Sequence, residues 1–400
     1  MQTFARADDV MGEAVISTIR RRCPERADAR PMAGLTPLAR GAVLGMLLAA
    51  CAATSAWAAS STEQSSSILI FPKVVFDGTR DTFIQISNTA NSMVHAHCFY
   101  VNAAPLCIGA GDCLAGTCTG TCQPQWVEVD FSIWLTKQQP THWGVGSGRF
   151  PDPSIVPCDP KNSECDGAGL DPGRVPPANS VPFLGELRCI EVDQSGAPIS
   201  GNHLKGEATI VSTDGDASRY NAVGLLGEPF SNDGDGVLCL GGGVTDQCRS
   251  GAEYEGCGDH AFLDHFAEDA DDPLFGPTSR VDTEVTLVPC QADYEHQNPA
   301  RITVNFTVFD EFELRFSAAT VVDCWRSFFL DDVNSIFRIS TLQTRLAVTR
   351  MQSSSGSDSG FVGVAEEYHR LRDQQARVAF NLHEQGTRQQ TDLIFVPEGP

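Results

Sequence analysis

Two carboxylates stand at alternate positions of the segment Ser231–Gly236, SNDGDG, and these residue types could bind a metal ion. Asp233 and Asp235 would offer hard oxygen ligands from a tight turn, which is the chemistry that Ca²⁺ prefers. The twelfth position counted from Ser231 is Gly242, so the bidentate Glu of a complete EF-hand loop is missing. Ordinary Asp-Gly turns are the alternative that the incomplete pattern favours. Structural calcium is the candidate cofactor, and no other is expected.

Tryptophans form a second candidate site, for stacking on sugar rings. Residues 126–135 alternate between polar and apolar side chains, and Trp126 and Trp134 belong to the polar side. Trp143 follows shortly after. Aromatic rings on an open polar sheet face would make a glycan-binding surface, whereas a loop or a neighbouring domain could cover the same face. The pattern favours the covered face.

The paired ionisable residues do not show an arrangement typical of catalysis. His95 and His97 would point to one face of a strand, but without a third ligand they favour polar packing over metal binding. Glu366 and Glu367 are adjacent on a strand, so they face opposite ways and do not form an acid–base pair.

Asp310 continues the buried phase of the apolar residues 302–308, and a carboxylate there would face the core. A turn or bulge at Asp310–Glu311 avoids that buried charge, and we expect one. The sequence holds no G-x-S-x-G, H-E-x-x-H or phosphate-binding glycine motif. No catalytic residue is therefore predicted.

The cysteines are a further set of residues with reactive chemistry. Of the 15 cysteines, Cys23 and Cys51 precede Ala58, and the other thirteen follow it. Most lie in Gly-, Asp- and Pro-rich loops, where disulfides would hold segments without a core of their own. The predicted bridges are Cys158–Cys165, two among Cys107, Cys113, Cys118 and Cys122, and Cys290–Cys324 across strands. An odd number leaves one thiol unpaired or paired between chains, and the spacings lack the C-x2-C pairs of zinc sites.

The elements that position these residues are predicted to be β-strands. Runs rich in β-branched and aromatic residues recur between turn residues, and helical spacing is nearly absent. We expect an all-β chain of antiparallel, Ig-like sandwiches with disulfide-rich loop insertions. Pro72, inside the first run, predicts an edge strand or a bulge because Pro cannot donate to the ladder. Asp259–Ala270 is the single helix candidate, with an apolar stripe and Asp259 as N-cap.

Composition divides the chain into five parts. These are a signal region 1–58 whose true start could be Met32, a Ser-rich linker 59–66, a first sandwich 67–230, an acidic connection 231–280 with the short helix, and a second sandwich region 281–400. The first sandwich would carry Cys-rich insertions.

The signal region predicts export. Arg40 precedes an apolar stretch that ends in the A-x-A site Ala56–Ala58, as in a signal peptide. The same stretch contains a lipobox-like sequence ending at Cys51, which would be acylated in a lipoprotein. The apolar run continues past Cys51, which favours ordinary cleavage over lipidation. The stretch is too short for a membrane anchor, and we expect no transmembrane segment.

The charge of the mature chain limits its partners. The whole chain carries −23, and removal of 1–58, with seven basic and five acidic residues, leaves a net charge near −25. Such a surface repels phosphate backbones and anionic lipids, so we expect neither nucleic-acid binding nor membrane-surface binding.

Five segments resemble a group of uncharacterised exported proteins from Gram-negative bacteria. They are SILIFPKVVFDGTRDTFIQISNT (67–89), HAHCFYVNA (95–103), FDEFELRFS (309–317), GVAEEY (363–368) and AFNLHEQGTR (379–388). The resemblance implies an envelope location and a β-rich fold. It implies no activity and no site residues.

Together these features predict an exported protein that is secreted, periplasmic or attached to the outer membrane, with a binding, adhesive or structural role. A glycan or an envelope protein is the expected partner. The alternative is an extracellular hydrolase that acts on polysaccharide through loop carboxylates. An enzyme would need carboxylates or histidines that converge in a cleft, for example Asp310, Glu366 and His369.

Overall fold

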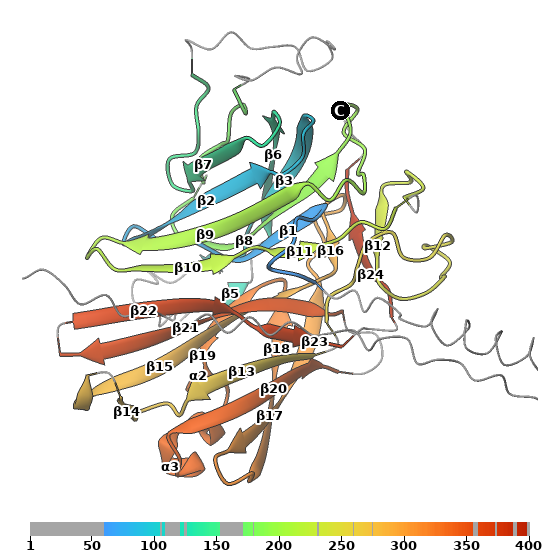
Figure 1. The fold of residues 1–400 in the computed structure, drawn as a ribbon. Helices are drawn as coiled ribbons and strands as arrows, with labels where there is room; N and C mark the ends of the chain where they lie inside the picture. Colours follow the sequence, from blue (N-terminus) through green and yellow to red (C-terminus); the bar gives the residue numbers. More distant parts are fainter. Residues whose placement is uncertain are drawn as a thin grey trace, which may run out of the picture. The chain divides into compact units, whose positions relative to one another are not determined.

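The computed structural model describes residues 60–104, 106–108, 121–123, 126–152, 171–178, 180–229, 232–258, 260–273, 275–354, 359–372, 374–386 and 390–397. They belong to one compact unit, Trp57–Pro400. Regular structure in them is nearly all β (Figure 1), which confirms the all-β prediction, while its Ig-like detail stays a prediction. The helical turns are α2 Leu330–Val333, η2 Ser335–Phe337 and α3 Ile339–Leu342. No described helix is long and apolar enough to span a bilayer.

The N-terminal strands form one antiparallel sheet. They are β1 Ile68–Phe76, β2 Arg80–Asn88, β3 Val94–Asn102, β6 Val127–Leu135, β7 Pro140–Gly144, β8 Phe183–Val192, β9 Leu204–Ser212, β10 Ala217–Asn221 and β11 Val223–Leu225. The order is β10-β9-β2-β1-β8-β3-β6, with β7 added to β2 and β11 to β1.

This sheet folds over into a sandwich. A single register pair, Phe76 with Asp81, links β1 to β2. One layer therefore holds β11, β1, β8, β3 and β6, and the other holds β10, β9, β2 and β7. Side chains alternate along β2, so that Ile84 and Ile86 are buried between the layers while Phe83 faces outward.

The C-terminal strands build a second pair of sheets. They are β13 His260–Phe266, β14 Ala270–Asp272, β15 Gly276–Pro289, β17 Arg301–Asp310, β18 Arg315–Asp323, β19 Arg326–Phe329, β20 Leu346–Ser353, β21 Phe361–Leu371, β22 Gln374–Asn381 and β23 His383–Gln385. One sheet has the order β18-β17-β20-β13-β23 and the other β14-β15-β21-β22, with β19 on β15. An apolar core that includes Val304, Phe306 and Leu287 lies between them.

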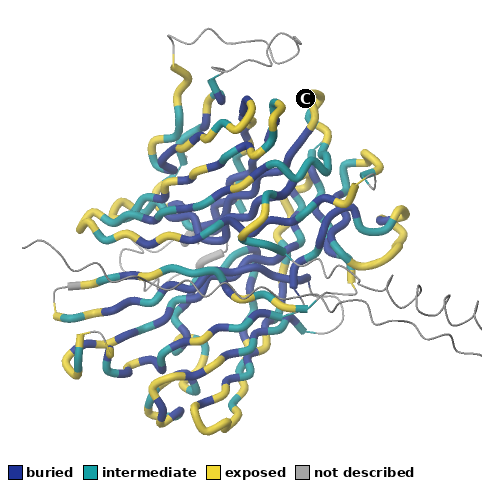
Figure 2. The backbone as a smooth tube through the Cα atoms, in the orientation of Figure 1, coloured by how far each residue is buried: buried dark blue, intermediate teal, exposed yellow. Residues whose placement is uncertain are grey.

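A small sheet and a shared core join the two groups. The small sheet has the order β12-β24-β16, formed by Val237–Leu240, Asp392–Phe395 and Ala292–Asp293, and β16 runs parallel to β24. Its apolar side chains pack with Ile68, Ile70 and Phe99 of the first sandwich. Figure 2 shows the buried backbone concentrated between the strand layers.

The Ser-rich segment is attached to the first sandwich by its backbone. Ser61 forms an antiparallel bridge with Gly224, and Ser66 forms one with Leu204. The described part of the predicted linker therefore follows the sheet.

Of the two alternatives predicted from Pro72, an edge strand or a bulge, the structure has the bulge. The β1–β8 register shifts between Phe71 and Val74, because Pro72 and Lys73 of β1 stand opposite Glu186 alone. A bulge turns side chains away from their regular alternation. Lys73 is thereby directed into the space between the sandwiches, as described below.

The helix predicted for residues 259–270 is wrong. His260–Phe266 is the strand β13, paired with both β20 and β23. The segment also alternates, with Ala261, Leu263 and His265 buried and the residues between them more exposed. Long-range pairing decides between two patterns that so short a segment fits equally well. Asp259, the proposed N-cap, lies outside the described residues.

The structure also changes the disulfide assignment. The described pairs are Cys98–Cys189, Cys239–Cys248 and Cys257–Cys290. The predicted Cys290–Cys324 bridge is therefore wrong, because Cys290 lies beside Cys257, the residue that leads into β13. Cys324 is buried, and burial raises the pKa of its thiol to about 12.

Most of the predicted loop bridges lie outside the described residues, namely those of Cys113, Cys118, Cys158 and Cys165. Cys107 and Cys122 are register partners in the short ladder of β4 Leu106–Ile108 with β5 Thr121–Gln123.

Candidate ligand-binding face

The three tryptophans do not form one exposed surface. Trp143 is buried in the core of the first sandwich, where its indole N–H donates to the Tyr100 hydroxyl at 2.5 Å. Trp126 packs on the shared core, 6.0 Å from the Tyr294 ring. Trp134 stacks on His95 with the ring centroids 3.8 Å apart. The neighbouring strands thus cover much of the face that the sequence singled out.

The carboxylates proposed for calcium stabilise local turns. The Asp235 backbone N–H donates to Asp233 Oδ1 at 3.3 Å, and the Val237 N–H donates to Asp235 Oδ1 at 2.9 Å. Glu253 accepts the Asp233 N–H at 2.9 Å. Among the described residues, no group of three His, Cys, Asp or Glu side chains is placed to hold a metal ion.

His95 and His97 also have separate partners. His95 Nδ1 lies 2.9 Å from the Asp193 carbonyl oxygen, and His97 Nε2 lies 2.9 Å from Asp130 Oδ2. They share a sheet face, as expected, but each ring is used in packing.

Asp310, Glu366 and His369, which a hydrolase would need in one cleft, each have different partners in the structure. Asp310 ends β17 and accepts the backbone N–H groups of Phe312 and Leu314, each at 2.8 Å, so the expected turn is present. The turn does not remove the carboxylate from the core, because Asp310 is buried. His369 pairs with Asp272 at 2.8 Å. Glu366 belongs to a different cluster, in which its own side chain is fully buried.

This buried cluster, which we call the Lys73 cluster, links the sandwiches. Glu284 of β15 and Glu366 of β21 are direct cross-strand partners, an arrangement that repels like charges. The Lys73 ammonium lies 2.7 Å from Glu284 Oε2 and 2.5 Å from Glu366 Oε2. Hydroxyls donate to the same carboxylates, from Ser327 and Tyr368 to Glu284 and from Ser218 to Glu366.

The cluster is built to stay ionised. Burial alone would raise the pKa of Glu284, but the Lys73 charge and the hydrogen bonds from Lys73, Ser327 and Tyr368 lower it to about 2. The pKa of Glu366 is lowered against its burial by Lys73 and Ser218. Both carboxylates find their ion-pair and hydrogen-bond partners within the protein. We therefore interpret the Lys73 cluster as a structural connection between the sandwiches and not as a ligand site.

An open sheet face offers a better candidate. The outward side chains of β2 and β9 form it, and we call it the β2–β9 face. Their inward neighbours, such as Ile84, Ile86 and Ala208, fill the sandwich core. The outward residues have no sheet above them among the described residues, and Phe83 remains 40% exposed.

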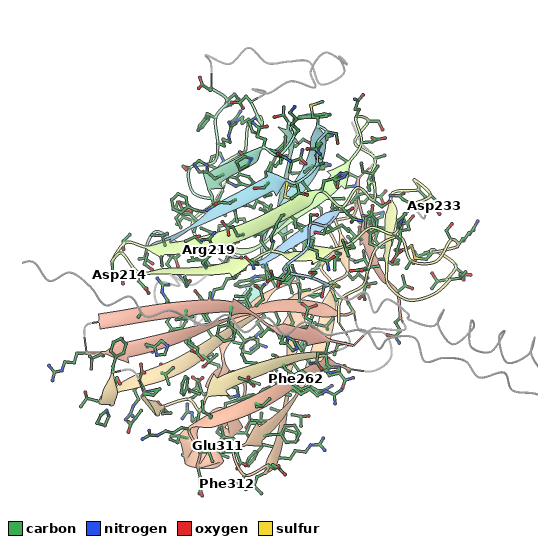
Figure 3. The ribbon with its side chains drawn as sticks, in the orientation of Figure 1. Asp214, Arg219, Asp233, Phe262, Glu311 and Phe312 are labelled. Carbon is green, nitrogen blue, oxygen red and sulfur yellow. A yellow bond between two sulfur atoms is a disulfide. The ribbon has the colours of Figure 1, made fainter. Side chains whose placement is uncertain are left out.

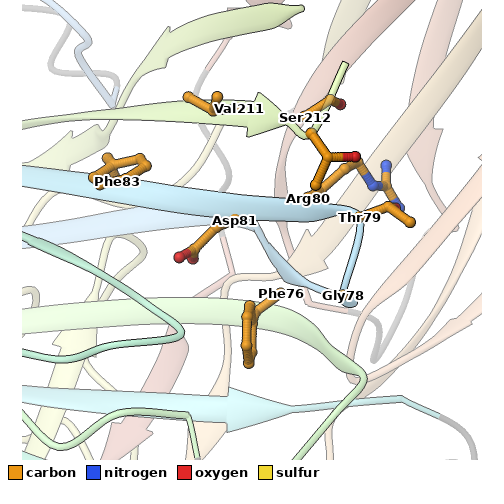
Figure 4. Close-up of a pocket in the computed structure, with 9 residues that line it drawn as sticks. Phe76, Gly78, Thr79, Arg80, Asp81, Phe83, Val211 and Ser212 are labelled. Carbon is orange, nitrogen blue, oxygen red and sulfur yellow. The ribbon is translucent and has the colours of Figure 1, made fainter. Parts of the chain in front are cut away.

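The first hollow on this face has a volume of about 260 Å³ (Figure 4). Phe76, Phe83 and Val211 supply its apolar wall. The polar lining comes from the turn before β2 and the end of β9, and the residues are Thr79, Arg80, Asp81, Ser212 and Thr213.

Hydrogen bonds fix the charged groups of the first hollow. Arg80 Nε donates to Asp77 Oδ2 at 2.8 Å, and Asp77 also accepts the backbone N–H groups of Thr79 and Arg80. Asp81 accepts the Gly146 N–H at 3.0 Å, while burial raises the pKa of its carboxyl. The turn is therefore held in one geometry.

A second hollow of about 230 Å³ lies further along the same strands. Its lining is polar and comprises Gln85, Ser87, Thr89, Lys205, Glu207 and Asn221, with Gly206. Cross-strand register pairs Gln85 with Glu207 and Ser87 with Lys205. Arg219 of β10, marked in Figure 3, forms an ion pair with Glu207.

Sequence reasoning missed this face. The alternation of residues 82–87 already indicated which side chains point outward. The partner strand, residues 204–212, lies more than a hundred residues along the chain, and the hollows exist only once the two strands pair. Without the register between them, a lone exposed Phe is an ordinary surface residue.

The comparisons with known proteins do not add a family: no protein-family model and no curated protein matches this chain.

Proposed function

We propose that the chain is an exported protein, secreted or held in the bacterial envelope, with a binding or adhesive role, and that the β2–β9 face is its ligand-binding surface. The described disulfides support an oxidising compartment. The signal-like segment ending at Ala58 and the resemblance to uncharacterised exported proteins support the same location.

One observation carries the binding role. Two hollows lie along the paired strands β2 and β9, and each takes part of its lining from both strands, including Phe83 and Val211 in the first and Gln85 and Glu207 in the second. Sites on paired strands keep their geometry better than sites on loops, because the sheet hydrogen bonds and the core beneath hold every second residue.

The location is tested by the intact mass of the protein recovered after expression in a Gram-negative host. Cleavage after Ala58 gives an unmodified chain that begins at Ala59. A mass that begins at a diacylglyceryl-modified Cys51 would show lipidation instead. Protein that is found in the cytoplasm and still contains residues 40–58 would contradict export.

The binding role is tested by screening the mature protein against arrays of glycans and of envelope proteins. We expect a ligand whose binding is weakened at least tenfold by Phe83→Ala and is unchanged by Phe312→Ala. Phe312 is a matched control because it is 75% exposed and lies in the turn between β17 and β18, on the other sandwich (Figure 3). Binding that Phe83→Ala leaves intact would contradict the assignment of the face.

A further inference from the structure

We infer that the ligand of the β2–β9 face is a neutral oligosaccharide that occupies both hollows at once. This inference rests on the proposed binding role of the face and goes further by assigning the chemical class of the ligand. It follows from the charge of the lining, its aromatic wall, its hydrogen-bonding groups and the length of the face.

The lining is electrically balanced, although the protein is strongly acidic. The charged residues that line the hollows are Arg80 and Lys205, which are positive, and Asp81 and Glu207, which are negative, and Arg80 forms an ion pair with Asp77 as Glu207 does with Arg219. Their sum is zero in a chain whose net charge is −23. A site for a polyanion would concentrate cations, and a site for a polycation would use the abundant carboxylates. Balance favours a ligand without charge.

The aromatic wall suits the apolar side of a sugar ring. Phe83 is 40% exposed, and its cross-strand neighbour on β7 is Gly144, which has no side chain to cover the ring. A Cβ at Gly144 would meet Phe83 Cε1 at 3.4 Å. The axial C–H groups of a pyranose can pack against such an open ring, while the hydroxyls of the sugar project sideways.

The second hollow supplies the partners that those hydroxyls need. Gln85 and Asn221 each carry an amide that both donates and accepts, and Ser87 and Thr89 carry hydroxyls that do the same. Lys205 adds donors and Glu207 adds acceptors. A neutral, hydroxyl-rich ligand uses donors and acceptors together, which matches this mixed set.

The backbone of the face disfavours an extended peptide. Peptides that bind to sheets commonly pair with a free strand edge. Here β2 is paired on both sides, with β7 and β9, and β9 is paired with β2 and β10. A peptide laid on this face would find side chains but no unpaired main chain.

The length of the face favours several sugar units. Phe83 in the first hollow and Ser87 in the second are four residues apart on one strand, which is about 14 Å at 3.4 Å per residue. Each hollow is smaller than the roughly 300–1,000 Å³ of typical small-molecule sites. A ligand that contacts both must therefore be extended, and each unit is held weakly.

The test uses the mature, disulfide-bonded protein and four immobilised probes: neutral dextran and galactomannan oligosaccharides, anionic polygalacturonate and cationic chitosan oligomers. A library of unstructured peptides is the fifth arm. We expect saturable binding to a neutral oligosaccharide. Phe83→Ala and the double variant Gln85→Ala/Asn221→Ala should each weaken it at least tenfold, and Phe312→Ala should not change it. Unaltered melting temperatures show that the variants are folded.

The outcomes separate the two proposals. Phe83-dependent binding to polygalacturonate, chitosan or a peptide alone would overturn the neutral-glycan inference and leave the binding face in place. Neutral-glycan binding that withstands both the Phe83 and the Gln85/Asn221 substitutions would overturn the inference as a statement about this face. Loss of binding in the Phe83 variant with full binding in the Gln85/Asn221 variant would overturn the claim that the ligand spans both hollows.

Discussion

At the scale of single residues, the fold depends on charges that are buried only because they are neutralised. Lys73 is 1% exposed, and it separates two carboxylates that face each other across β15 and β21. Removing one partner from such a cluster leaves an uncompensated buried charge, which costs far more than the intact cluster contributes. No sequence pattern showed this, because the three residues come from strands far apart in the chain.

Lys73→Met should therefore lower the free energy of unfolding by about 3–5 kcal/mol. Urea denaturation of the mature protein measures the change. Lys137→Met is the matched control, since Lys137 is exposed and its loss should stay within about 0.5 kcal/mol. Equal stability of the two variants would show that the ionic contacts of Lys73 contribute nothing.

Glu268 predicts a pH dependence of stability. Its side chain is 1% exposed, and burial raises the pKa of its carboxyl to about 9. The folded protein binds this proton more tightly than the unfolded chain, so stability is present below the unfolded pKa near 4.5 and falls as pH rises toward 9. Glu268→Gln keeps the oxygen that accepts the Thr283 N–H. It should reduce the loss of stability between pH 5 and pH 9 by at least about 1 kcal/mol. Denaturation curves of both proteins at the two pH values measure this, and parallel pH profiles would contradict it.

At the scale of elements, single residues predicted the features that depend on their immediate neighbours in the chain, such as a bulge and a turn. Pro72 predicted an edge strand or a bulge because Pro lacks an N–H, and the bulge is present. The turn predicted at Asp310 is also present, but its carboxylate stays buried, where it accepts N–H groups of that turn. The segment 260–266 was misjudged because seven residues fit both a helical stripe and a strand. Cys290 was assigned the wrong partner because distance along the chain does not reveal which strand ends meet.

The contribution of each disulfide to the free energy of unfolding should increase with the number of residues in the loop that it closes. Cys98–Cys189 has a sequence separation of 91 residues, and Cys239–Cys248 has one of 9. In the chain-entropy model, replacing the first pair by alanines should cost about 2 kcal/mol more than replacing the second. Chemical denaturation of the two double variants measures the difference. A larger cost for the 239–248 pair would contradict the entropic account.

At the scale of the whole molecule, the strand runs were enough to predict an all-β chain, and the structure has the all-β fold. Export, predicted from the signal region, stays a prediction. The β2–β9 face could not be predicted, because it depends on pairing residues 80–88 with 204–212 and on the closing of the sandwich beneath them. The tryptophans drew attention because of their type, but packing buried one and covered much of the others. The position of the exposed Phe83 beside polar residues of opposite charge could be recognised only from the structure.

Hydroxyl-radical footprinting of the mature protein, with and without the neutral oligosaccharide, tests the central claim most directly, since it reports the exposure of individual side chains. The ligand should protect Phe83 and Phe76 from oxidation and leave Phe312 on the other sandwich unchanged. Protection confined to residues outside the β2–β9 face, with Phe83 oxidised at the same rate in both states, would contradict the account.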